Sequence, residues 1–414
     1  MARGELPREV ARRIIDTVGG SGTPPEYGFQ YFTVGLDDYL QVLEGEYLAD
    51  YIQQGGSCFK LVVGIYGGGK THFLYCVRER AWRHRFVVSY VTLSPEQTPL
   101  HKLELVYRAV ALNLTRPLTA AELQSGYEQG IESLVQSWYA QKRAELEHAG
   151  FSGDELAEAL RSYAATIRGF ESVSFARAMQ GAFLALLERR DEDFDTLMQW
   201  LKGEGYVRSL HGKLGILQRI DRSTAFSMLR SLLQWVRFLG YAGLVILMDE
   251  AERVPSLSSR QRELLLHNLR ELIDACAQVH FKHTLCLYAV PDETFLEGRA
   301  QIYEALRQRL ATTFDVINPT GVKIDLEKAG SDAVATLEAI GHKLAAIYAV
   351  AYDTSLDSAH LSATTSEIAQ AAYEHRYGEA GYKRLFVQRL VQALHLLRIR
   401  GGPVSARDVG LEST

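Results

Sequence analysis

Eight consecutive residues, Gly64 to Thr71, have the types and the spacing of a site for a nucleoside triphosphate. They read GIYGGGKT, which matches the pattern G-x-x-x-x-G-K-[ST]. In such a loop, glycines allow backbone N–H groups to curl around phosphate; here they are Gly64, Gly67, Gly68 and Gly69. Lys70 supplies a positive charge for the β- and γ-phosphates, and the Thr71 hydroxyl reaches Mg²⁺. The pattern therefore predicts ATP and Mg²⁺ as ligands.

The residues on both sides of this loop agree with that prediction. The apolar run from Phe59 to Ile65 predicts a buried strand, and the segment from Thr71 to Val77 predicts a helix. The N-terminus of that helix adds a partial positive charge beside the phosphates. His72 follows directly, and its side chain either approaches the nucleotide or packs on the helix surface. An ordinary glycine-rich turn is the alternative for the whole segment, but it explains neither the Lys-Thr pair nor the flanking elements.

A second set of polar residues ends an apolar strand far along the chain. The residues from Leu244 to Met248 are apolar, and Asp249 and Glu250 follow them directly. Asp249 is suited to hold Mg²⁺ through its water shell. Glu250 is suited to polarise an attacking water, which favours hydrolysis over nucleotide storage. The alternative is a strand end followed by a helix cap.

A parallel sheet is needed to bring these two sets of residues together. Further apolar segments that predict strands are 86–93, 284–290 and either 314–317 or 322–326. Helical patterns separate them, an order typical of a parallel sheet with helices on both faces. Roughly 150 residues separate the second strand from the Asp249 strand, far more than an ordinary connection needs. The interval is therefore a large insertion, with expected helices at 120–149, 153–169, 174–190, 194–203 and 223–240.

The predicted fold class is an α/β phosphate-loop NTPase with this helical insertion and a C-terminal helical lid. From about Ser331 the pattern is helical throughout, and a small helical bundle after such a sheet suits a lid over the nucleotide. We expect four parts: 1–58 as an N-terminal lead-in that covers the nucleotide site, 59–118 with 241–328 as the ATPase core, 119–240 as the insertion, and 329–414 as the lid.

The composition excludes several classes of protein. The chain has 414 residues, of which 47% are hydrophobic and 23% charged, as in an ordinary globular protein. No run reaches the ~18 uncharged apolar residues of a membrane span, and the first residues lack a signal-peptide core, so we expect a cytoplasmic protein without a membrane partner. The four cysteines lack the spacing of metal ligands and are expected to pack in a reducing compartment; they are Cys58, Cys76, Cys276 and Cys286.

One basic segment differs from the rest of the chain, whose net charge is −5. Residues 206–240 contain six basic side chains and one acidic side chain, Asp221. The basic residues are Arg208, Lys213, Arg219, Arg222, Arg230 and Arg237. They form either a surface for the phosphate backbone of DNA or the solvated face of a helix that packs elsewhere.

The phosphate loop, the Asp249-Glu250 pair and the C-terminal helices together resemble an AAA+ ATPase. Residues 381–384, Gly-Tyr-Lys-Arg, resemble its G-x-x-R sensor-2 motif, which implies that Arg384 contacts the γ-phosphate. The helix before the last strand lies where that class places its arginine finger, which implies this role for Arg309 or Arg307. Because a finger acts on the nucleotide of a neighbouring subunit, the resemblance implies a homo-oligomer.

Three segments are similar to the ATP-binding proteins of bacterial BREX phage defence, the BrxC and BrxD group. They are the loop 66–74, residues 200–204, and residues 240–244 that lead into the Asp249 strand. The resemblance implies DNA as a partner, together with a helicase or methyltransferase of the same defence system. That family usually shows Ala-Thr-Pro after the fourth strand, but Val290 replaces the threonine here and cannot hydrogen-bond a phosphate. A sensor-1 role would pass to Tyr288 or Asp292.

Two functions fit these residues. The first is an ATP-hydrolysing, oligomeric motor or loader that acts on DNA with a helicase, and it depends on Glu250, Arg384 and the basic segment. The second is an ATP-dependent recruitment switch with little turnover, which the apolar Val290 favours.

Overall fold

The structure is a computed structural model that describes residues 6–94, 99–249, 257–297, 301–329, 332–376 and 381–411. At its centre is a six-stranded sheet with the order β3-β2-β4-β5-β1-β6. The strands are β1 (Ser57–Val63), β2 (Val87–Thr92), β3 (Leu114–Thr115), β4 (Leu244–Asp249), β5 (Thr284–Val290) and β6 (Lys323–Asp325). All neighbours are parallel except β2 and β3, which are antiparallel. The predicted α/β class is confirmed, and β3 is an antiparallel edge strand that the sequence analysis did not predict.

The central strands are apolar because helices cover both faces of the sheet. Every residue of β4 and β5 is buried. Successive side chains of a strand point to opposite faces, so Leu61 packs in one core and Val62 in the other. Near-continuous apolar strands are typical of parallel sheets with two covered faces.

The order of the strands places the end of β1 at a switch point of the sheet. From β1 the chain passes to β2, beyond β5 and β4, and after β5 it returns to β6 on the other side of β1. Ligands of open α/β sheets bind at such a point, beside the carboxyl ends of the strands. The carboxyl end of β4 lies on the same side of the sheet as the carboxyl end of β1, because β1, β5 and β4 are parallel.

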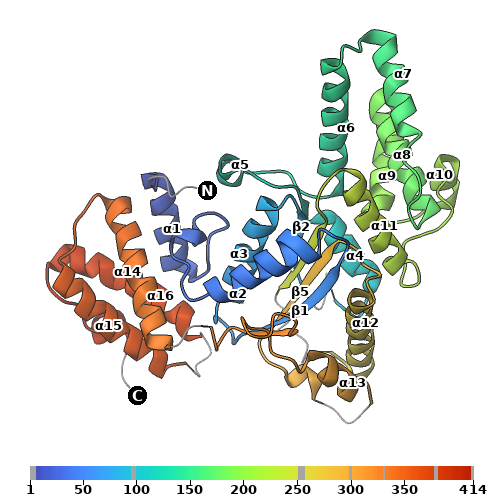
Figure 1. Cartoon of the computed structure of the whole chain (residues 1–414). Helices are drawn as coiled ribbons and strands as arrows, with labels where there is room; N and C mark the ends of the chain where they lie inside the picture. Colours follow the sequence, from blue (N-terminus) through green and yellow to red (C-terminus); the bar gives the residue numbers. More distant parts are fainter. Residues whose placement is uncertain are drawn as a thin grey trace.

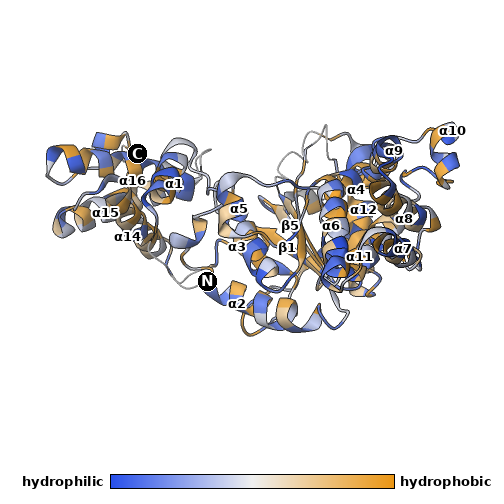
Figure 2. Cartoon of the chain, turned by 90° about the horizontal axis from the view of Figure 1, so that it is seen from above, coloured by the Kyte–Doolittle hydropathy of each residue, from blue (hydrophilic) through white to orange (hydrophobic). Residues whose placement is uncertain are grey.

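The helices of the core lie on both faces of this sheet. On one face are α3 (Lys70–Arg83) with α2 (Asp37–Val42) and the π-helical segment η2 (Leu43–Tyr51). On the other are α4 (Leu103–Leu112), α12 (Ser259–Ala277) and α13 (Gln301–Leu310). Figure 1 shows the sheet between these layers, and Figure 2 shows its hydrophobic strands at the middle of the molecule.

The large insertion is helical, as predicted. Its helices are α5 (Ala120–Ser125), α6 (Ile131–His148), α7 (Gly153–Ala164), α8 (Val173–Glu188), α9 (Asp191–Leu201), α10 (Arg208–His211) and α11 (Ala225–Phe238). The expected single helix at 120–149 is two helices, because Gly126 and Gly130 adopt positive φ between them. Rings of Trp138, Phe183 and Trp235 form its core. The last helix, α11, packs against α4 and so returns the chain to the sheet.

The C-terminal region is a helical bundle of α14 (Ala333–Tyr352), α15 (Ser358–Glu374) and α16 (Tyr382–Arg400). The first helix of the chain, α1 (Arg8–Ser21), packs against α14 and α16. The expected N-terminal lead-in is therefore divided, since α1 joins the lid bundle while α2 and η2 join the core. Figures 1 and 2 show this bundle and the insertion at opposite ends of the molecule.

Among the described residues, α14 is the one helix whose length and composition would allow it to cross a membrane. Core helices of globular proteins pass the same test. Glu338 and Lys343 interrupt its apolar run, while Leu337, Leu344 and Tyr348 are fully buried with side chains of α1 and α16. We therefore describe α14 as a core helix of the bundle.

Candidate nucleotide-binding site

The predicted phosphate loop connects β1 directly to α3. Gly67 and Gly69 have φ of 66° and 101°, values that side chains with a Cβ rarely adopt. The helix begins at Lys70, so its first N–H groups face the loop. The Lys70 ammonium is buried and donates to the carbonyls of Gly64 and Ile65, at 2.9 and 3.1 Å. The loop therefore forms a cradle of N–H groups closed by one lysine.

The two polar motifs of the sequence meet at the end of this loop. The Thr71 hydroxyl donates to Asp249 Oδ2 at 2.7 Å, although the two residues are 178 positions apart. Asp249 is buried, with 2% of its surface exposed, and it ends β4. Tyr90, on the neighbouring β2, donates a second hydrogen bond to the same carboxylate oxygen. A hydroxyl and a carboxylate are oxygen ligands of the kind that Mg²⁺ prefers, so the pair fits that ion.

The His72 ring is held by aromatic and polar neighbours beside the loop. Its Nε2 lies 2.7 Å from the Thr33 hydroxyl, and it meets the edges of Phe29 and Phe32 at ring distances of 5.7 and 5.2 Å. Burial, with a smaller effect from Lys383, lowers its pKa to about 4. His72 is therefore a neutral packing residue that also lines the cavity next to the loop.

The first turn of α16 lies against the phosphate loop. Lys383 donates to the Gly68 carbonyl at 3.0 Å, and Arg384 donates to the Tyr66 hydroxyl at 2.7 Å. Gly381, just before the helix, approaches so closely that an added Cβ would lie 1.8 Å from the Tyr66 carbonyl oxygen. The lid bundle is therefore closed on the loop through these few residues.

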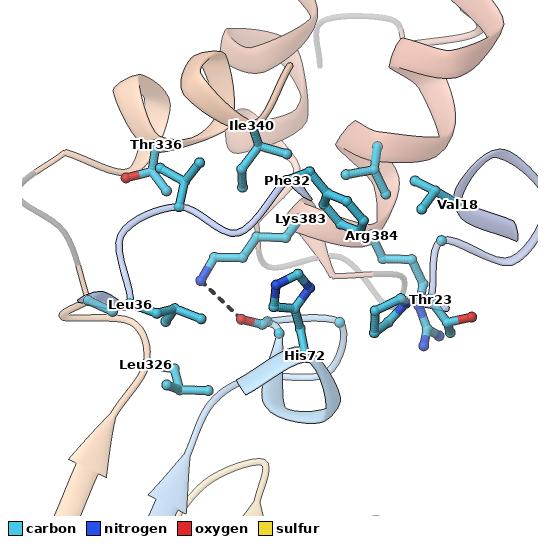
Figure 3. A pocket seen from close by; sticks show the side chains of 18 residues that line it. Val18, Thr23, Phe32, Leu36, His72, Leu326, Thr336, Ile340, Lys383 and Arg384 are labelled. Atoms are coloured by element: carbon cyan, nitrogen blue, oxygen red, sulfur yellow. Dashed lines mark hydrogen bonds between the residues drawn. The ribbon is translucent and has the colours of Figure 1, made fainter. Parts of the chain in front are cut away.

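A cavity lies between the loop, the N-terminal segment and the lid. It contains about 740 Å³ of space, including the part open to solvent, which is the size of a small-molecule site. Gly67 to Gly69 and His72 form its floor, Phe32 and Leu36 one wall, and the residues of α14 and α16 its roof. Figure 3 shows Lys383 reaching the loop across this space, with Arg384 on the side of Thr23.

The predicted general base lies outside the residues that the structure describes. Glu250 follows Asp249, and the described chain resumes at Leu257. At the carboxyl end of β5, Val290 is buried and Asp292 accepts two hydrogen bonds from Thr294. Tyr288 is fully buried among apolar side chains, and burial raises its pKa.

The two candidate arginine fingers differ in their surroundings on α13. Arg309 forms a bidentate pair with Asp274, at 2.6 and 3.2 Å, and also donates to the Ala305 carbonyl. Arg307 is exposed, and among the described residues it has no ion pair. Arg307 is thus exposed to solvent, whereas Arg309 joins α13 to α12.

The sequence analysis missed two residues of this site, Tyr90 and Lys383. Tyr90 lies within an apolar strand, where a tyrosine is usually a packing residue. Lys383 is adjacent to Arg384, to which the motif drew attention. Burial lowers the pKa of Lys383, and Glu327 and Asp325 partly offset this effect. A tyrosine one strand away from an acidic strand end is the signal that would have identified Tyr90.

The sheet order, the glycine-rich loop and the Thr71–Asp249 contact together define a P-loop NTPase-like fold. The model of one protein family, the BREX system ATP-binding proteins BrxC/D, matches residues 6–403, and the chain belongs to that family. A search of curated proteins gave no match. Membership confirms the resemblance to this family and supports ATP binding by the chain.

Proposed function

We propose that this protein hydrolyses ATP with Mg²⁺ in the cytoplasm, as a homo-oligomeric, DNA-associated motor or loader of a BREX antiviral system that works with a helicase or methyltransferase. The observation that supports this most strongly is the Thr71–Asp249 hydrogen bond, which joins the two motifs at the end of the phosphate loop. A nucleotide store needs the loop, but an ATPase also needs a carboxylate at this position.

In the proposed reaction each residue acts on the phosphates or on water. Lys70 exchanges the carbonyls of Gly64 and Ile65 for β- and γ-phosphate oxygens. Thr71 and Asp249 would hold Mg²⁺, which would neutralise charge on the phosphates. Glu250 accepts a proton from the attacking water. Tyr90 fixes the orientation of Asp249 through its hydrogen bond.

The lid couples this chemistry to movement of the bundle. Lys383 and Arg384 now contact the Gly68 carbonyl and the Tyr66 hydroxyl, but a phosphate is a stronger partner for both cations. When ATP binds, these side chains turn toward it, and when phosphate leaves, they return to the loop. The lid and α1 then move together, because α1 packs on α14 and α16.

The test uses two variants that separate binding from hydrolysis. Lys70→Ala removes the cation of the loop and should abolish ATP binding. Glu250→Gln keeps the shape but accepts no proton, so it should bind ATP and slow turnover by roughly 10²–10⁴-fold. Binding is measured with a fluorescent ATP analogue and turnover by phosphate release. Wild-type turnover in Glu250→Gln would show that Glu250 is not the base.

A recruitment switch with little turnover is the second candidate. It is favoured by the end of β5, where Val290 is apolar and Asp292 is already bonded to Thr294. Turnover with and without duplex DNA distinguishes the two functions. A motor accelerates when DNA is added, whereas a switch shows the same slow rate and a change of assembly with a non-hydrolysable analogue.

A further inference from the structure

A second cleft lies at the amino-terminal ends of the parallel strands, between α11 and the turn that precedes β5. It contains about 1300 Å³ of space, including the part open to solvent. Arg230 and Arg237 contribute to it from α11, and His280, Lys282 and His283 contribute from the turn. Thr284, where β5 begins, pairs with Ser57, where β1 begins, so the cleft and the phosphate loop lie at opposite ends of these strands. A seven-residue strand separates the two sites by roughly 20 Å.

The arginines of α11 lie on one exposed face of the helix. Arg230, Gln234 and Arg237 follow the i, i+4, i+7 spacing of a single helix face. Residues of the opposite face, including Leu232 and Trp235, are fully buried. Packing therefore explains the apolar half of α11 but does not explain why two arginines face the cleft.

The positive charges of the cleft exceed the negative ones. Glu171 is the one carboxylate among its described lining residues, and Arg230 already pairs with it through two hydrogen bonds of 2.5 and 2.7 Å. Arg237 donates to the neutral Tyr241 carbonyl, and Lys282 is exposed. Within the described part of the chain, neither cation has an ion-pair partner. Two positive charges thus remain uncompensated.

The pKa of His283 reflects this positive field. Burial lowers the pKa most, and the charges of Arg237 and Lys282 lower it further. The backbone of the same turn is also strained, since Val279 and His283 have φ of 56° and 59°. A β-branched residue at positive φ is uncommon, and such residues cluster where a backbone is shaped for a ligand.

We propose that this cleft binds phosphate groups of a nucleic-acid backbone, with Arg237 and Lys282 as the main contacts. The inference rests on the proposed DNA-associated function and names the surface that performs it. A cleft open to solvent with separated cations suits a chain of phosphodiesters, and backbone contacts of this kind are independent of base sequence. The turn residues lie far from 206–240 in sequence, so the basic segment alone indicated only half of the site.

The experiment compares two variants with the same change of charge in the full chain. Arg237→Gln with Lys282→Gln neutralises the cleft, and Arg208→Gln with Arg222→Gln neutralises two exposed arginines outside it. Affinity for a labelled random-sequence duplex is measured by anisotropy at several salt concentrations. Each lost contact should reduce the log–log salt slope by roughly 0.9, so the cleft variant should bind about 60-fold more weakly near 0.1 M salt. The control pair should bind as the wild type does.

The outcomes separate this inference from the proposed function. If the wild type binds DNA and the cleft variant binds equally well, the cleft assignment is wrong while the DNA-associated function remains. If the wild type binds no DNA with or without ATP, both fail. Calorimetry with inorganic pyrophosphate tests whether the cleft binds free phosphate groups instead. If the cleft variant loses binding of pyrophosphate but binds DNA as the wild type does, the proposal is also overturned. Unchanged ATP turnover without DNA and unchanged melting temperatures show that the variants fold. Lys282→Gln alone removes one of the two contacts and should weaken DNA binding less than the double variant does.

Discussion

Adding one methyl group to Gly381 should force the lid away from the phosphate loop. The Cβ of Gly381→Ala would lie 1.8 Å from the Tyr66 carbonyl oxygen, whereas real Cβ atoms stay at least 3.0 Å from such neighbours. The lid must therefore move by about 1 Å or more. That movement lengthens the 3.0 Å bond from Lys383 to Gly68 to roughly 4 Å, beyond hydrogen-bonding distance.

The same movement carries Lys383 away from the phosphate toward which it turns when ATP binds, so the expected effect on ATP is the loss of that contact. A hydrogen bond to a charged group contributes roughly 1.5–3 kcal/mol, so ATP affinity should fall roughly 10- to 150-fold if the lid no longer closes the cavity. Affinity is measured by titration with a fluorescent ATP analogue, and lid position by the distance between labels on α14 and α7.

The other end of the same helix provides a matched control. Gly401 has the same φ of 70°, but an added Cβ would meet nothing within 4 Å. Gly401→Ala therefore introduces the backbone strain alone, about 1–2 kcal/mol, without the collision. Both variants should melt earlier than the wild type, but only Gly381→Ala should lose ATP. Equal ATP affinity in the two variants would refute the reasoning that the lid touches the nucleotide through this turn.

Three further predictions concern the residues around the site. Tyr90→Phe removes a hydrogen-bond donor to Asp249. In ATP titrations this variant should bind about 10-fold more weakly, or worse, when Mg²⁺ is present, but not when it is absent. An equal loss of affinity in both conditions would contradict the role assigned to Tyr90. Arg307→Ala should keep the melting temperature of the wild type and lose turnover in the oligomer, and mixing it with Lys70→Ala should partly restore turnover. Arg309→Ala should instead melt at a lower temperature, because Asp274 loses its partner. The reverse pattern in melting and turnover assays would make Arg309 the finger. The pKa of His72 in the folded protein, about 4, lies below the usual 6.5. The stability contribution of the neutral ring is therefore complete above pH 6.5, and the free energy of unfolding falls by on the order of 3 kcal/mol as the pH decreases to about 4. Denaturant titrations across that range should show a smaller fall for His72→Asn.

Elements with a strong local pattern could be predicted from the sequence. The strand, loop and helix around Lys70 follow from an apolar run, a glycine pattern and a helical period, and all three lie in adjacent residues. The strand β3 has only two residues, too few for any periodicity to show, and it forms because Thr115 and Leu114 pair with β2. Local pattern therefore predicts the central strands but not the edge.

Contacts between distant segments were the harder part. The α1 helix has an apolar face that predicts burial, but nothing in residues 8–21 indicates that its partners are α14 and α16. The basic segment 206–240 was visible as charge, yet Arg230 and Arg219 pair with Glu171 and Asp221, and Lys282 comes from another part of the chain. A count of charged residues in the sequence does not show which cations already form ion pairs in the fold.

The packing of α1 on the last helices has a consequence for synthesis on the ribosome. The apolar face of α1 consists of Val10, Ala11, Ile14, Ile15 and Val18. Its partner α16 ends at Arg400, so α1 leaves the ribosome long before the surface that buries it exists. At about 5–20 residues per second, roughly 20–80 s pass between the two events. During that time the nascent chain exposes an unpaired apolar helix, a segment of the kind that chaperones bind, and we expect truncations before α16 to aggregate.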